Sequence, residues 1–99
     1  MEDITSTTRS SAFGVNGGPV YIRMKGTFDG AVLGVYFSPE AGDNVTEASW
    51  DRLSDPDGNT FTDEKAFWAD LPKGSISFKA DSVGGSTSVS VAVQEINYA

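Results

Sequence analysis

The sequence predicts an all-β protein: a single antiparallel β-sandwich or small barrel with an extended polar N-terminal arm. Short segments in which apolar and polar residues alternate recur at intervals of about 8 to 12 residues. Turns rich in Gly, Pro, Asp and Asn separate them, and no helical period is sustained anywhere in the chain. The 99 residues suffice for one domain, with residues 1–16 as the arm and 17–99 as the body.

The arm is rich in Ser and Thr, and the stretch from Thr5 to Ser11 is entirely polar. Such a segment buries too little apolar surface to offset the entropy lost on ordering. We expect it either to be disordered or to order by adding a strand to a neighbouring subunit. Its deletion should then leave the melting temperature nearly unchanged. The residues expected to contact the neighbour are Ile4, Arg9, Phe13 and Val15.

The body alternates in a way that identifies most of its strands. In residues 20–25 the pattern places Val20, Ile22 and Met24 on one face, and a turn follows in which Gly26 and Gly30 stand where positive φ is needed. The remaining segments expected to form strands are 31–38, 48–53, 60–62, 75–80 and 88–96, the last two as a hairpin. Segment 66–71 fits a helical turn and a strand equally well.

The residue types present argue against an enzyme. There is no histidine and no cysteine, which removes the commonest general base and all thiolate chemistry. Carboxylates alone can hydrolyse glycosides, but a domain this small rarely encloses a sugar. We therefore expect no catalytic residue and no cofactor.

One turn is compared with a calcium loop, because Asp55, Asp57 and Asn59 alternate as oxygen ligands do there. Its glycine, Gly58, is in the fourth place and not the sixth, and Ala66 stands where a glutamate belongs. The segment 55–59 is better explained as a Pro-Asp-Gly hairpin loop, so we expect no metal.

The net charge of −7 disfavours nucleic acids and anionic membranes as partners. No apolar run approaches the roughly 20 residues of a membrane span, and the acidic start is unlike a secretory signal. Synthesis in the cytoplasm is expected. A protein that inhibits an enzyme by mimicking DNA stays an alternative, although the carboxylates are not gathered in dense runs.

Three aromatic residues, Tyr36, Trp50 and Trp68, have two interpretations. They can form a surface on which a sugar ring stacks, which would indicate a glycan-binding or receptor-binding module. Aromatic residues of a sandwich more often fill its core, and Trp50 falls where an inward face is expected. The triplet Asn44-Val45-Thr46 fits a glycosylation acceptor, which matters only in a secreted eukaryotic protein.

Turn glycines and short strands follow one another in a defined order over residues 17–96. The segments are Gly26-Thr27-Phe28-Asp29-Gly30, Val35-Tyr36-Phe37-Ser38-Pro39, Ser49-Trp50, Leu71-Pro72-Lys73-Gly74-Ser75-Ile76-Ser77-Phe78 and Gly84-Gly85-Ser86-Thr87-Ser88-Val89-Ser90-Val91. This order resembles that of small β-sandwich virion structural proteins of tailed bacteriophages, of the capsid decoration or cement type. The acidic stretch 51–70 departs from the family pattern.

The resemblance implies a protein of the capsid surface that binds the major capsid protein and strengthens the shell. Shell sites at local three-fold positions imply a homotrimer. A head-tail or tail component is the alternative that the same resemblance allows.

Overall fold

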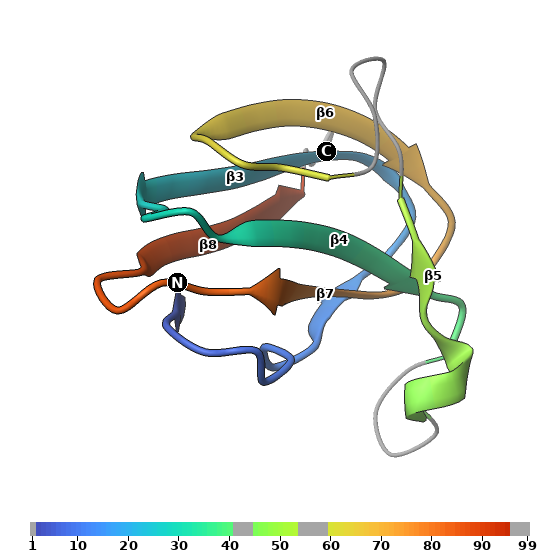
Figure 1. Ribbon diagram of the computed structural model, residues 1–99. Helices are drawn as coiled ribbons and strands as arrows, with labels where there is room; N and C mark the ends of the chain where they lie inside the picture. The colour runs from blue at the N-terminus through green and yellow to red at the C-terminus, as the bar shows by residue number, and fades with distance from the viewer. Residues whose placement is uncertain (1, 41–44, 54–59, 96–99) are drawn as a thin grey trace.

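The computed structural model describes residues 2–40, 45–53 and 60–95, which form two four-stranded antiparallel sheets packed face to face (Figure 1). Sheet A has the order β1 (Glu2–Ile4), β8 (Ser88–Glu95), β3 (Gly18–Thr27) and β6 (Lys65–Leu71). Sheet B has the order β2 (Phe13–Val15), β7 (Gly74–Ser82), β4 (Val32–Ser38) and β5 (Asp51–Arg52). The all-β fold class is confirmed. Because the sheets of the described chain do not close into a barrel, the architecture is the sandwich.

The core lies between the two sheets and follows from the alternation of their strands. Val20, Ile22 and Met24 of β3 point inward, as the sequence predicts, and none of them is more than 1 % exposed. Phe78 of β7 is completely buried, and its ring meets that of Phe13 edge-on at a centroid distance of 5.8 Å. Burial of such side chains is the main source of the fold's stability.

The predicted hairpin between segments 75–80 and 88–96 is wrong. Strand β7 pairs with β4 and β2 in sheet B, whereas β8 pairs with β3 and β1 in sheet A. The connection between them crosses the sandwich beside the β3–β4 turn, where the Thr87 hydroxyl donates to the Phe28 carbonyl at 2.7 Å. Alternation identifies a strand and its inward face. It does not show whether two strands lie side by side in one sheet or face each other across the core from different sheets.

The β3–β4 turn has the glycine conformations that the sequence predicts. Gly26 has a φ of 142° and Gly30 a φ of 79°, both in the region that L side chains rarely adopt. A Cβ on Gly26 would also collide with the carbonyl oxygen of Ser88 on β8. Glycine at position 26 therefore permits β3 to stay paired with β8 through to its end.

The segments between β4 and β7 differ in part from expectation. Segment 66–71 is a strand, β6, and Phe61 of the predicted strand 60–62 makes a single bridge with Leu33. Residues 48–53 do not form one strand, because Glu47–Ser49 form a 3₁₀ turn, η2, and only β5 pairs with β4. The Ser49 hydroxyl donates to the Thr46 carbonyl at 2.7 Å, a local bond that competes with strand pairing. The turn 55–59 and Asn44 lie outside the described residues.

The expectation that residues 2–16 form an arm off the body is wrong. Strand β1 pairs with β8 and β2 pairs with β7, so the segment, blue in Figure 1, crosses from sheet A to sheet B of its own chain. Ile4 and Val15 are each only 3 % exposed and belong to the core. A strand needs an apolar residue only at alternate positions, so two three-residue strands with one core side chain each can dock on the edges of β8 and β7.

The stretch between β1 and β2 is held to β7 by Ser10. Its N–H donates to the Phe78 carbonyl at 2.8 Å, and the Phe78 N–H donates to the Ser10 hydroxyl at 2.9 Å. Ser10 is 8 % exposed, so its hydroxyl is a buried acceptor for the Phe78 N–H. If β2 were longer, a backbone carbonyl of β2 would accept this N–H. The edge of β7 is thereby covered beyond the end of β2.

Substitution Ser10→Ala is expected to lower the free energy of unfolding by about 1 to 3 kcal/mol, because it leaves the buried Phe78 N–H without an acceptor. Denaturant unfolding followed by circular dichroism measures the change. Ser11→Ala is the matched control, since Ser11 is exposed and adjacent. Equal midpoints for the two variants would show that the Ser10 hydroxyl does not stabilise this edge.

Candidate functional site

The outer face of sheet B carries a group of side chains that we call the arginine clamp: Arg9, Tyr36, Trp50 and Arg52. The guanidinium carbon of Arg9 lies 4.4 Å from the centroid of the Tyr36 ring and 5.2 Å from that of Trp50. The guanidinium of Arg52 lies 5.4 Å from the Tyr36 ring. Both cations are within the range of cation–π attraction, so they hold the two aromatic rings against the sheet.

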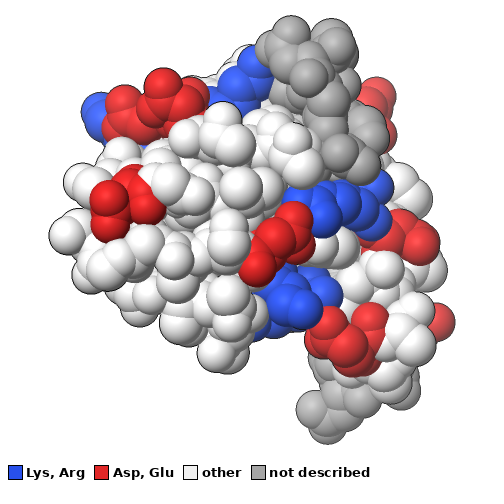
Figure 2. All heavy atoms as spheres, viewed as in Figure 1, with Lys and Arg blue, Asp and Glu red and all other residues white. Residues whose placement is uncertain are grey.

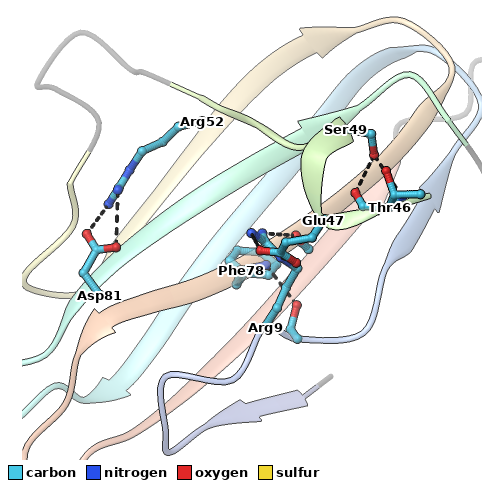
Figure 3. Close-up of polar contacts among 9 residues, drawn as sticks. Arg9, Thr46, Glu47, Ser49, Arg52, Phe78 and Asp81 are labelled. Carbon is cyan, nitrogen blue, oxygen red and sulfur yellow. Dashed lines mark hydrogen bonds and ion pairs between the residues drawn. The ribbon is translucent and has the colours of Figure 1, made fainter.

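Arg9 ties three parts of the chain together (Figure 3). Its Nη2 and Nε donate to the Glu47 carboxylate at 2.7 and 3.1 Å, and its Nη1 donates to the Ser77 hydroxyl at 2.9 Å. The Arg9 side chain is only 14 % exposed. Arg9 therefore connects the β1–β2 stretch to η2 and β7 of its own chain, and the predicted contact of Arg9 with a neighbouring subunit stays a prediction.

Arg52 forms the second ion pair of the clamp, with Asp81 at an Nη2–Oδ2 distance of 2.8 Å (Figure 3). This hydrogen bond raises the pKa of Arg52. The guanidinium lies over Gly34, where an added Cβ would stand 2.7 Å from Nη2. In Figure 2 the basic and acidic atoms near the centre of this face lie next to one another. The clamp is thus filled by internal contacts, and we assign it a structural role.

The Arg9–Glu47 pair predicts a dependence of stability on pH. Hydrogen bonding from Arg9 lowers the pKa of Glu47 below its ordinary value of 4.5. A group with a lowered folded-state pKa contributes stability above that ordinary value and loses it as the pH falls through the folded-state pKa. Glu47 is largely exposed, so the contribution is small.

We therefore expect Glu47→Gln to melt slightly below the wild type near neutral pH and to melt with it at a pH well below 4.5. Melting curves at the two pH values measure the difference. Glu40→Gln is the control, because the Glu40 side chain makes no ion pair with any described residue. A gap between Glu47→Gln and the wild type that persists in acid would contradict the role of the carboxylate charge.

A different surface, which we call the aromatic-cationic face, lies on the outside of sheet A. It consists of Tyr21, Arg23 and Lys25 from β3 and of Ala66 and Trp68 from β6. Trp68 is 60 % exposed, and its ring centroid lies 5.0 Å from that of Tyr21 with the planes inclined by 50°. The two residues are paired in the β3–β6 register, so the sheet itself brings the rings together.

Beside the two rings the surface is hollowed. The hollow has a volume of about 320 Å³ and is lined by Tyr21, Arg23, Met24, Lys25, Glu64, Lys65 and Ala66. Ala66 is the small residue between Glu64 and Trp68 on the outward side of this segment, and it leaves the space open. The carboxylate of Glu64 accepts the Gly26 N–H at 3.0 Å, which fixes one wall of the hollow to the end of β3.

The three aromatic residues proposed from the sequence do not form one platform. Tyr36 and Trp50 lie against Arg9 on sheet B, whereas Trp68 lies on the outer face of sheet A. Trp50 is half-buried on Arg9 and does not face the core as expected, because η2 interrupts the alternation just before it.

Sequence reasoning did not single out Tyr21 as a partner of Trp68. The signal was present, since inward Val20 and Ile22 require Tyr21 to point outward. The pairing could not be inferred, because it depends on which strand lies beside β3 and on the strand character of residues 65–71.

Comparison with protein-family models, curated proteins and solved structures found no match. In the described part of the chain no group of three or more Asp or Glu residues is placed to hold a metal ion. The same residues include no helix long and apolar enough to cross a membrane. The exposed ring of Trp68, its contact with Tyr21 and the hollow beside them make the aromatic-cationic face the candidate functional site.

Proposed function

We propose that this protein is a non-enzymatic structural protein of a tailed-phage virion, and specifically a decoration protein that binds the outer shell. The proposal depends on the location in the fold of the segments by which the sequence resembles small phage virion proteins. Gly26, Phe28 and Thr87 belong to two adjacent connections between the sheets, the β3–β4 turn and the β7–β8 connection. Phe37 and Ser38 are buried in β4. The resemblance therefore rests on residues that specify a rigid body.

A rigid acidic body suits this role. A decoration protein needs a stable fold and a surface that stays soluble at high local concentration, and a net charge of −7 favours the second. Its partners would be the major capsid protein and two further copies of itself, at a local three-fold position. The contact with the shell would not use Ile4, Phe13 or Val15, because these side chains pack within the chain.

Quantitative mass spectrometry and electron microscopy of purified particles test the proposal. We expect a copy number comparable to that of the shell subunit and density for this chain on the capsid surface. Light scattering of the isolated protein is expected to give the mass of a trimer. A position confined to the tail would exclude decoration, and absence from particles would exclude a virion role and favour the acidic inhibitor.

A further inference from the structure

The outer face of sheet A places chemically different side chains in ordered rows. Across β8, β3 and β6 the first row is Gln94, Tyr21 and Trp68, and the next is Ala92, Arg23 and Ala66. Because both neighbours of Arg23 in its row are alanines with short side chains, its guanidinium is exposed next to the aromatic row. An apolar ring surface and a guanidinium thus share one shallow depression.

The cations of this face are available to a ligand. Arg23 and Lys25 are exposed, and within residues 2–40, 45–53 and 60–95 neither makes an ion pair or a side-chain hydrogen bond. Two basic residues, Arg23 and Lys25, line the hollow beside the aromatic pair. In a protein of net charge −7 this is a local excess of positive charge against the one carboxylate in the wall, Glu64.

The nearby carboxylates form no ion pair with Arg23 or Lys25 among the described residues. Glu64 accepts the Gly26 N–H at 3.0 Å, and Asp3 on β1 accepts the Ser90 hydroxyl at 2.7 Å. Asp70 stands on the far side of Trp68 from Arg23, because outward residues of β6 follow one another along the strand. The positive charge therefore lies on one side of the aromatic pair.

We propose that the aromatic-cationic face binds an acidic sugar, a pyranose ring that carries a carboxylate, within an oligosaccharide. The apolar face of the ring packs on Trp68 and Tyr21, where it covers exposed aromatic surface. The carboxylate meets Arg23 in the planar two-bond geometry that guanidinium groups favour, with Lys25 beside it. Glu64 accepts a hydroxyl group of the sugar. This inference does not depend on where in a particle the protein is found.

The size and the charge of the site favour this ligand class. A hollow of about 320 Å³ is at the lower end of small-ligand sites and fits one or two sugar rings. A nucleic-acid strand would bring many phosphates toward a chain of net charge −7, so long-range repulsion opposes it. A single carboxylate is attracted by the local cations at short range and is affected far less by the distant charges.

Titration of the full chain with an oligogalacturonate, followed by NMR of the backbone amides, tests the proposal. A maltooligosaccharide of the same length is the uncharged comparison. We expect the acidic oligosaccharide to bind with a dissociation constant on the order of 1 mM or tighter, to shift amides of β3 and β6, and to bind more weakly as salt is added.

Three variants sharpen the test. Trp68→Ala is expected to weaken binding of the acidic oligosaccharide at least about tenfold, the effect of roughly 1.4 kcal/mol. Arg23→Met keeps the length of the aliphatic stem and removes the charge. It is expected to abolish the preference for the acidic over the neutral oligosaccharide. Lys79→Met is the matched control, because it removes a cation from β7 in sheet B, and it should bind as the wild type does. Thermal melts establish that each variant is folded.

Several outcomes would overturn the proposal. They are the absence of any shift, shifts confined to sheet B, equal binding of both oligosaccharides to the wild type, and unchanged binding by Trp68→Ala. Light scattering addresses the competing occupant, a second copy of the chain. Self-association that Trp68→Ala abolishes would assign the face to assembly and contradict the sugar site.

Discussion

A chain that lacks residues 2–16 is expected to be largely unfolded at room temperature. The deletion removes Ile4 and Val15 from the core and exposes the edges of β8 and β7. Truncation of one buried aliphatic side chain costs about 1 to 4 kcal/mol, and a domain of this size has a total stability of about 5 to 15 kcal/mol. Far-ultraviolet circular dichroism and the dispersion of amide resonances measure the loss.

Point variants separate side-chain packing from the loss of chain. Ile4→Ala is expected to lower the free energy of unfolding by about 2 to 4 kcal/mol, which shifts the melting temperature of a domain this size by roughly 10 °C or more. Thr7→Ala, at an exposed position of the same segment, is expected to melt with the wild type. A truncated protein with unchanged melting would restore the interpretation of residues 2–16 as a passive arm.

Substitution Phe78→Ala is expected to cost about 3 to 5 kcal/mol of unfolding free energy. Phe78 is completely buried at the centre of β7, and its ring contacts that of Phe13 edge-on, so truncation leaves a cavity in the core. The substitution also removes the ring on which Phe13 of β2 packs, which weakens the contact of the N-terminal segment with β7. Chemical denaturation with the slope held common to both proteins measures the change.

Trp68→Ala is the matched control for Phe78→Ala, because it removes a larger ring from a surface position. Trp68 is 60 % exposed, so its loss is limited to the contact with Tyr21 and is expected to cost less than about 1.5 kcal/mol. If the two variants were equally destabilised, Trp68 would belong to the stabilising framework, and its exposure would no longer point to a ligand.

The location of the N-terminal segment changes where a partner is expected. The sequence predicts a subunit contact through Arg9, whereas the structure shows Arg9 engaged by Glu47, Ser77 and two aromatic rings of its own chain. A subunit contact through Arg9 would have to replace these bonds. The aromatic-cationic face makes no such demand, since Arg23 and Lys25 lose no ion pair among described residues when they bind.

The all-β class, the inward faces of the strands and the glycines of the β3–β4 turn are predictable from the residues alone, because these features depend on alternation and on backbone sterics within a few residues. The pairing of the strands, the location of β7 and β8 in different sheets and the contact of Trp68 with Tyr21 became known only from the folded chain. Strand pairing joins residues far apart in the chain, such as Tyr21 and Trp68, and depends on how all inward faces fill one core. The polar N-terminal segment belongs to the sandwich for a related reason. Its backbone pairs with the edges of β8 and β7, and side-chain composition does not predict such backbone hydrogen bonds.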